Sequence, residues 1–309
     1  MSFEVQILGS NSALSSHGRH PSSQIVRIRS HTFLIDCGEG TQFQFQKYKC
    51  KPFRINCVFI SHLHGDHYFG LIGLLTTYQL LKRETPLTIY GPPELETIVN
   101  LQLSVAGSTL TYPITFVSTQ ARAPEIIIDD EDVTVQTIPL VHRIPCTGFI
   151  IREKQSPRKI DPDRISGLHL SPAHFDALRR GEDVTDNDGV FHRNARLTIP
   201  GYAPRSYAYC TDTLYLPEIV PYIEEVDLLY HEATFLDEAR ERAVITFHST
   251  AAQAATLAKS ASVNRLVIGH FSSKYPDLQE MLDEARRIFL NTELAIEGKI
   301  FSIERSDRL

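Results

Sequence analysis

The sequence predicts an α/β protein in which alternating strands and helices pack in layers. Short apolar runs rich in β-branched residues alternate with segments whose apolar residues recur at helical spacing. Polar side chains able to bind metal ions follow several predicted strands, and in α/β proteins such side chains gather at one sheet edge. With 42% hydrophobic and 22% charged residues, and no low-complexity run, the composition is that of a folded globular protein.

The first third of the chain carries clear strand and helix patterns. Apolar and alternating runs predict strands at residues 3–8, 24–28, 32–36 and 55–62, and helical spacing predicts helices at residues 41–49 and 68–82. The strand at 55–62 is mostly apolar, so we expect it to be buried. Its carboxyl end then leads directly into a cluster of histidines.

Three strands of the second half each end at a residue able to bind a metal ion. We expect "SYAYCTD" to end at Asp212, "EEVDLLYHEAT" at His231 and "NRLVIGHFS" at His270, with helices at residues 251–260 and 278–289. Because the carboxyl ends of parallel strands share one edge, these segments and the histidine cluster are expected to converge on one site.

The stretch "SHLHGDHYFG" contains His62, His64, Asp66 and His67 in the pattern H-x-H-x-D-H. In an extended segment, residues two apart point the same way, so His62 and His64 are able to share one ion. Asp66 and His67 then face a second ion. The alternative for so many histidines is a polar loop without metal.

Two ions need more ligands than this motif supplies, and three later residues are of the right type. We expect His62, His64 and His142 on one ion, Asp66, His67 and His270 on the other, and Asp212 between them. Any one of the later residues would more commonly be a hydrogen-bonded or surface side chain. Their shared position after strands favours a two-metal site, which activates water and offsets phosphoryl charge. Hydrolysis is therefore the expected class of reaction.

A polar insertion separates His142 from Asp212. Between Arg152 and Arg196 it carries nine Arg or Lys against eight Asp or Glu, and it lacks a strand pattern. One helix is expected at residues 172–180, capped by Ser171 and ended by Gly181. We expect a protruding insertion with too few apolar residues for a core of its own, and a plain surface excursion is the alternative.

Charge and cysteine usage restrict the class of protein. The net charge of −6 argues against non-specific coating of nucleic acid. The five cysteines form no C-x-x-C pair, and neither a signal peptide nor an apolar run of about 20 residues is apparent. We expect a cytoplasmic protein with free thiols and no membrane segment.

These motifs resemble the metallo-β-lactamase superfamily and, within it, the ribonuclease Z family of tRNA 3′-processing endonucleases. The resemblance runs the length of the chain and is carried by "FLIDCGEGTQ", "FISHLHGDHYFGLIGLL", "YHEATF" and "FHSTAAQAA". It implies a four-layer αβ/βα sandwich forming a single domain over residues 1–309, with a flexible arm at about 152–197 that grips tRNA. It also implies two Zn²⁺ per subunit, a homodimer, and a supporting role for Asp36 behind the histidine loop.

The same resemblance implies how the residues divide the chemistry. Asp66 binds metal and positions the attacking water as a base, while His248 donates a proton to the leaving ribose 3′-oxygen and Glu232 orients His248. An alkoxide leaving group needs such an acid, and a carboxylate partner raises the pKa of a histidine. The free amides of the helix beginning near Thr250 would favour a phosphate, although Ser249 or Thr250 as a plain helix cap, and His231 as a structural residue, are the alternatives.

One loop departs from the family pattern. Many members carry P-x-K-x-R-N after the first strand, where this chain reads "LSSHGRHPSS" and Arg19 is the residue left to keep the basic role. Two other functions stay open at this point. One is a superfamily hydrolase acting on a small phosphodiester, a sulfate ester or a thioester, and the other is a non-catalytic RNA-binding protein braced by metal.

Overall fold

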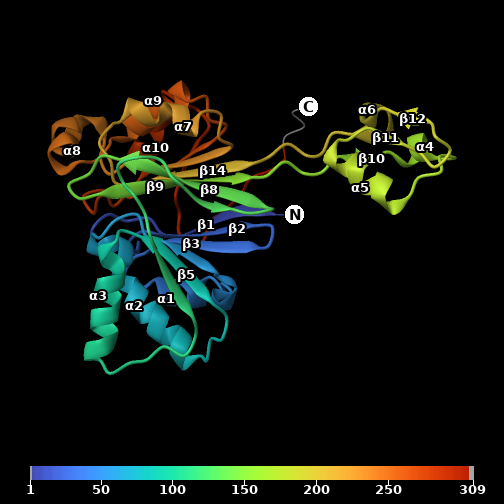
Figure 1. Cartoon of the computed structure of the whole chain (residues 1–309). Helices are drawn as coiled ribbons and strands as arrows, with labels where there is room; N and C mark the ends of the chain where they lie inside the picture. Colours follow the sequence, from blue (N-terminus) through green and yellow to red (C-terminus); the bar gives the residue numbers. More distant parts are fainter. Residues whose placement is uncertain (1, 306–309) are drawn as a thin grey trace. The chain divides into compact units, whose positions relative to one another are not determined.

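The computed structural model describes residues 2–305, which fall into two compact units (Figure 1). The first unit, here called the body, comprises residues 2–152 and Ser206–Ile303. The second, here called the arm, comprises Glu153–Arg205 together with Glu304 and Arg305.

Two seven-stranded sheets form the centre of the body. The first has the order β18-β1-β2-β3-β4-β5-β6 and the second the order β17-β16-β15-β14-β9-β8-β7. The strands of the first sheet are β1 Phe3–Gly9, β2 Ser23–Ile28, β3 His31–Cys37, β4 Cys57–Phe59, β5 Leu87–Gly91, β6 Ile114–Ser118 and β18 Ile300–Ser302. Those of the second are β7 Ile126–Asp129, β8 Val133–Leu140, β9 Cys146–Glu153, β14 Ser206–Cys210, β15 Leu228–Glu232, β16 Leu266–Gly269 and β17 Thr292–Leu294.

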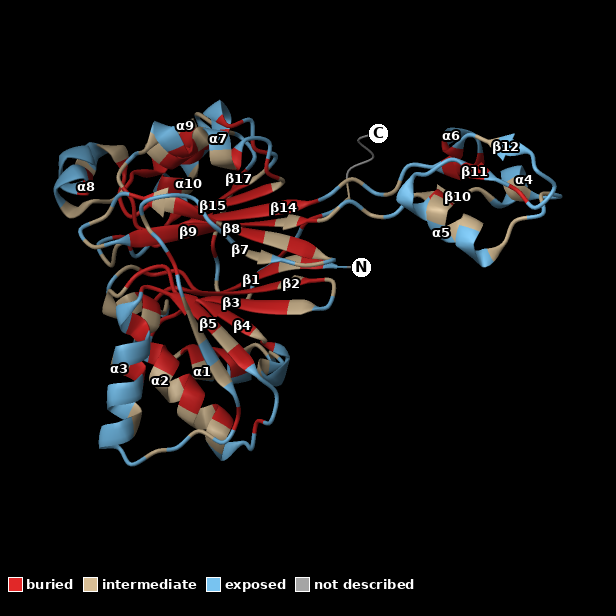
Figure 2. Cartoon of the chain, viewed as in Figure 1, coloured by how far each residue is buried: buried red, intermediate tan, exposed pale blue. Residues whose placement is uncertain are grey.

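Helices cover the outer face of each sheet and complete four layers (Figure 1). On the first sheet lie α1 Thr41–Lys47, α2 Gly65–Leu80 and α3 Glu94–Val105, with the turn η1 Pro52–Arg54. The helical elements that accompany the second sheet are η2 Pro217–Ile219, α7 Val220–Ile223, η3 Asp237–Ala239, α8 Arg240–Thr246, α9 Ala251–Ser260 and α10 Gln279–Arg286. Buried residues concentrate in the strands and on the sheet-facing sides of these helices (Figure 2). The predicted layered α/β fold is confirmed.

Apolar side chains from both sheets share one core. Phe3 and Phe33 of the first sheet belong to the same buried cluster as Phe149 and Tyr207 of the second. A separate cluster joins the outer face of the first sheet to α2, through residues such as Leu71 and Leu75. The two faces of the first sheet are therefore buried against different layers, one against the second sheet and the other against α2.

Parallel pairing brings the functional strand ends to one edge in each sheet. Strands β3, β4, β5 and β6 are parallel, as are β14, β15, β16 and β17. Asp36 lies at the end of β3 and His62 follows β4, while Asp212 and His270 follow β14 and β16. The expected gathering of polar residues at strand ends is confirmed.

Two predicted boundaries were wrong near the histidine motif. The strand expected at 55–62 is regular only at Cys57–Phe59, because Ile55 still closes the turn η1. The helix expected from residue 68 begins at Gly65, since the amide of His67 already donates to the carbonyl of His64 at 3.0 Å. Asp66 therefore lies in the first helical turn, where a carboxylate is favoured by the helix dipole.

The arm contains short elements around a small apolar cluster. Two strand pairs, β10 Lys159–Ile160 with β13 Thr198–Ile199 and β11 Val184–Thr185 with β12 Phe191–His192, accompany α4 Pro162–Ile165, α5 Pro172–Arg180 and α6 Asn194–Leu197. The predicted helix matches α5, which has a capping box at Ser171 and ends at the left-handed Gly181.

One expectation about the arm was wrong, because Leu178, Val184 and Leu197 are buried together in it. These three positions are separated by stretches rich in polar residues, so the segment's average polarity conceals the cluster. The interpretation of the chain as a single domain carrying an insertion stays a prediction. Within residues 2–305, no helix combines the length and the apolar character needed to cross a lipid bilayer.

Candidate metal centre

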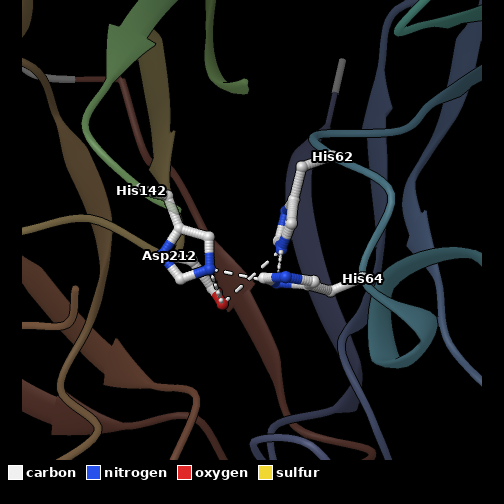
Figure 3. A group of neighbouring side chains, drawn as sticks. All are labelled: His62, His64, His142 and Asp212. Carbon is white, nitrogen blue, oxygen red and sulfur yellow. Dashed lines mark hydrogen bonds and ion pairs between the residues drawn. The ribbon is translucent and has the colours of Figure 1, made fainter. Parts of the chain in front are cut away.

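Four of the predicted ligands form one group, here called group one (Figure 3). Nδ1 of His64 lies 3.1 Å from Nε2 of His62 and 3.0 Å from Nε2 of His142. Oδ2 of Asp212 lies 3.6 Å from Nε2 of both His62 and His142. Three ring nitrogens and one carboxylate oxygen thus face a common point.

The remaining ligands form a second group, here called group two. Nε2 of His67 lies 3.3 Å from Nε2 of His270, and Oδ2 of Asp66 lies 3.4 Å from His270 and 3.6 Å from His67. Oδ1 of Asp212 lies 3.3 Å from Nε2 of His67 and 3.2 Å from Nε2 of His270. Asp212 therefore presents one oxygen to each group, the position expected for it from the sequence.

The spacing of these atoms fits metal ions. A tetrahedral zinc ion with bonds of about 2.0–2.2 Å sets neighbouring ligand atoms about 3.3–3.6 Å apart. The contacts described above range from 3.0 to 3.6 Å. Nε2 of His67 and Nε2 of His270 face each other while both Nδ1 atoms bond elsewhere, an arrangement that a cation between the rings stabilises.

The protonation behaviour of the two groups also suits cations. Burial lowers the pKa of His62, His64 and His142, so these imidazoles are neutral, which is the form that binds metal. In group two, burial opposes charge on His67, but the nearby carboxylates of Asp212 and Asp66 hold its pKa well above the usual value. Group two is an anionic pocket that requires a positive charge.

Most of the histidines have their second ring nitrogen held by another part of the body. Nδ1 of His67 donates to Asp36 at 2.7 Å, and Nδ1 of His142 donates to the carbonyl of Phe247 at 2.9 Å. Nδ1 of His270 donates to Oγ1 of Thr234 at 3.0 Å. These bonds fix the tautomer and leave Nε2 free to face the metal. The predicted supporting role of Asp36 agrees with this contact.

Asp36 also acts on group one through Ser61, a residue that sequence reasoning missed. Oγ of Ser61 donates to Oδ2 of Asp36 at 2.9 Å and lies 3.0 Å from Nδ1 of His62, which is placed to donate to it. The hydroxyl of Tyr209 donates to the same carboxylate oxygen at 2.7 Å. One buried carboxylate thus orients a ligand of each group.

We expect Ser61→Ala to weaken metal binding at group one by about ten- to a hundredfold, the usual effect of losing such a supporting bond. Zinc affinity would be measured by competition with a chromophoric chelator. Ser206→Ala is the matched control, because it removes a hydroxyl bonded to Asp227 at 3.1 Å and touches no proposed ligand. Equal zinc affinities in the two variants would refute this role of Ser61.

Backbone strain accompanies the site. Asp36, Phe247 and His270 have φ of 56°, 59° and 59°, in the left-handed region that non-glycine residues rarely occupy. Each either faces a metal group or holds one of its ligands. The hydrogen bond between His142 and the carbonyl of Phe247 joins residues more than a hundred positions apart, so it could not be predicted from the sequence.

The proposed acid His248 is paired with Glu232 as expected. Nδ1 of His248 lies 2.8 Å from Oε1 of Glu232, which is fully buried and also accepts from the amide of Thr213 at 3.0 Å. Burial opposes protonation, but the carboxylate raises the pKa of His248 to about 9. His248 therefore carries a proton at neutral pH, and cations bound nearby would lower this pKa toward neutrality.

A cavity of about 590 Å³ opens over both groups and His248. Its wall includes Asp66, Asp212 and His248, together with the exposed Arg143 and Arg242. Proposed ligands and the proposed proton donor thus face one space. Cationic side chains at its rim suit an anionic substrate.

One sequence-based expectation was wrong at the edge of this site. The first-turn amides of α9 are already bonded, since Ala252 donates to Glu284 at 3.0 Å and Gln253 to Thr250 at 3.2 Å. They are not free to bind phosphate, and Thr250 acts as a helix cap. The guanidinium of Arg19 donates to the carbonyls of Tyr275 and Pro276, and its basic role stays a prediction.

His231 has a structural position. It is fully buried, and its Nδ1 donates to the carbonyl of Glu232 at 2.7 Å. It belongs to neither metal group.

The amide of Ala13 makes an unexpected contact with the site, because it donates to Oδ2 of Asp66 at 2.7 Å. The loop after β1 therefore helps to hold a proposed ligand.

Comparison with known proteins identifies close relatives. The chain is 47% identical over 302 residues to ribonuclease Z of Phocaeicola vulgatus, covering 98% of each chain. It is 45% identical over 310 residues to ribonuclease Z of Cytophaga hutchinsonii, covering 100% of this chain and 98% of the relative. A family model described as anti-Pycsar protein Apyc1 matches residues 3–155.

Solved structures of related proteins share the fold of this chain. The short form of human tRNase Z superposes with a TM-score of 0.71 at 27% identity, covering 97% of this chain and 99% of that one. A metallo-β-lactamase fold protein from Bacillus subtilis has a TM-score of 0.68 at 18% identity, covering 98% and 100%, and this likeness concerns the fold alone. From the near full-length identity to its curated relatives, the chain belongs to the ribonuclease Z family, and it has the metallo-β-lactamase fold.

Proposed function

We propose that this chain is a zinc-dependent endoribonuclease that removes the 3′ trailer from precursor tRNA. It leaves a 3′-hydroxyl on the tRNA and a 5′-phosphate on the trailer. The observation that carries the proposal is Asp212, whose two oxygens face two separate ligand groups beside His248, which is paired with Glu232. The ribonuclease Z relatives at up to 47% identity support tRNA as the substrate.

The metal ligands in this proposal are His62, His64 and His142 for one ion, Asp66, His67 and His270 for the other, and Asp212 for both. Bound ions supply two things, a lowered pKa for the attacking water and compensation for negative charge on the phosphoryl oxygens. Imidazole-rich sites with carboxylates suit zinc, which supports two Zn²⁺ per subunit.

Asp66 and His248 divide the proton transfers. Asp66, with its side chain 10% exposed to the cavity, orients the attacking water and accepts its proton. His248 gives its proton to the ribose 3′-oxygen as the phosphorus–oxygen bond breaks, and Glu232 orients the ring and keeps it protonated until then. The two residues line the same cavity, so a single phosphate bound there can contact both.

The non-catalytic alternative is disfavoured by the cavity. A structural zinc site is closed by its protein ligands, whereas about 590 Å³ of space adjoins Asp66, Asp212 and His142 here. A substrate can therefore reach the proposed ligands.

The compartment and the assembly complete the proposal. All five cysteines are free, which suits a reducing cytoplasm. The family resemblance favours a homodimer, which light scattering on the purified protein would test.

The direct test is incubation of the purified protein with a 3′-extended tRNA, with and without a chelator, followed by mapping of both product ends. Cleavage that requires metal and yields the stated ends supports the proposal. Intact precursor in the presence of zinc would contradict it.

Excision of the arm separates tRNA processing from small-substrate hydrolysis. The arm's two connections are close, because β9 and β14 pair Arg152 with Ser206, and the amide of Glu153 donates to the carbonyl of Arg205 at 2.8 Å. Replacement of residues 154–204 by a short Gly/Ser linker is expected to lower kcat/KM for precursor tRNA by at least about a hundredfold, since remote binding energy is lost.

The same variant is expected to hydrolyse bis-p-nitrophenyl phosphate at the wild-type rate, because the proposed ligands all lie in the body. An enzyme evolved for a small phosphodiester, a sulfate ester or a thioester would show no selective loss. Equal loss of both activities would instead indicate damage to the body.

A further inference from the structure

A second cavity adjoins the metal centre and has no part in the chemistry described above. Its volume is about 890 Å³, within the range of about 300–1,000 Å³ typical of sites that enclose small ligands. His64, His142 and Arg143 line both this cavity and the one over the metal groups. The second cavity therefore lies directly beside the space over the metal groups.

The wall of this cavity suits a nucleobase. Apolar side chains including Leu63, Pro92, Leu140 and Ile144 supply most of it. Thr119 lies in the same wall and is only 4% exposed, yet its hydroxyl has no hydrogen-bond partner among residues 2–305. An apolar wall with one unsatisfied polar group fits a ring that has apolar faces and hydrogen-bonding edges.

The charges at the cavity suit a sugar–phosphate chain. Arg122 and Arg143 line it, both are exposed, and in the described part of the chain neither guanidinium has an ion-pair partner. The single acidic side chain in the lining is Glu94, so positive charge exceeds negative charge. Such an excess favours phosphates that follow the one being cleaved.

The position of His248 decides which side of the cut enters this cavity. His248 lines the first cavity but not the second, and in the proposed function it faces the ribose 3′-oxygen on the tRNA side. The other bridging oxygen of the phosphate leads to the trailer. We propose that the second cavity binds the base of the first trailer nucleotide, with Arg122 and Arg143 contacting the trailer backbone. This inference rests on the proposed tRNA 3′-endonuclease activity.

Filling the cavity tests the assignment. Ala121 lines it from the loop after β6, so Ala121→Trp would occupy space there. With an ordinary precursor tRNA, we expect this variant to lower kcat/KM by about tenfold, the scale of losing one base contact. With a precursor whose first trailer nucleotide is abasic, variant and wild type are expected to have equal kcat/KM. Ala106→Trp, at an exposed position outside both cavities, is the matched control.

Two outcomes would overturn the inference without touching the proposed function. One is an unchanged defect on the abasic-trailer substrate, and the other is recovery when the last tRNA nucleotide before the cut is abasic instead. A wild-type protein that cleaves none of these substrates would contradict the proposed function itself.

A second variant avoids any change of packing. Arg122→Ala, on the exposed loop, is expected to raise KM for precursors with long trailers and to reduce the salt dependence of kcat/KM by about 0.7 in the log–log slope, as for one lost phosphate contact. Arg287→Ala, at an exposed position outside both cavities, removes the same charge as a control. Identical salt slopes in the two variants would exclude the backbone contact.

Discussion

Asp212→Ala is expected to empty both metal groups and to lower kcat/KM for precursor tRNA by at least about a thousandfold. Its two oxygens lie 3.2–3.6 Å from ring nitrogens of different groups, so one substitution removes a ligand from each. A metal ion contributes several kcal/mol to such reactions, and about 1.4 kcal/mol corresponds to tenfold in rate. Metal content by mass spectrometry and single-turnover cleavage would measure the two effects.

The matched control for this substitution is Asp227→Ala. Asp227 also accepts hydrogen bonds inside the body, from the amide and hydroxyl of Ser206, but it lies outside both metal groups. We expect this control to retain both ions. An Asp212→Ala protein that still binds two ions with unchanged affinity would contradict the shared-ligand geometry.

His248→Ala is expected to lower kcat by about a hundred- to ten-thousandfold while both metal ions stay bound, since a positioned acid contributes on this scale. The loss of kcat is expected to depend on whether the leaving group needs a proton. A substrate with sulfur in place of the ribose 3′-oxygen at the cut needs no protonation of its leaving group, so we expect that substrate to restore the variant's rate close to that of wild type.

Measuring the metal content of the His248→Ala variant distinguishes a role as proton donor from a role as metal ligand. His248 lies near Asp212 and His270, within reach of a third metal-binding arrangement. A variant that loses an ion would identify His248 as a ligand, and one that keeps both ions but stays slow on the sulfur-containing substrate would exclude the acid role. Glu232→Gln, which leaves the ring in place but removes the carboxylate charge, is expected to show a smaller defect that the same substrate relieves.

Much of the fold and of the candidate site could be predicted because the relevant signals are local. H-x-H-x-D-H lies within six positions, and Asp212 and His270 each follow a recognisable strand. The rule that parallel strands end at one edge then brings them together. The helix at Pro172–Arg180 was found for the same reason, since its cap and its terminating glycine adjoin it.

The features that escaped prediction depend on contacts between distant segments. The amides at the start of α9 looked free because Glu284, which accepts one of them, belongs to α10. The carbonyl of Phe247 and the hydroxyl of Tyr209 gave no signal, because each acts on a residue more than a hundred positions away. Ser61 stands beside the motif, but only its orientation reveals that it joins Asp36 to His62.

The distribution of ligands over the two sheets has a consequence for folding. Group one joins His62 and His64, which follow a strand of the first sheet, to His142 and Asp212, which follow strands of the second. Ions bound there act as cross-links between the two halves of the body. When the free metal concentration is a hundred times the dissociation constant of a site, binding at that site would add about 2.7 kcal/mol to the free energy of unfolding. Metal supply would then control how much intact protein a cell contains, in addition to how active that protein is.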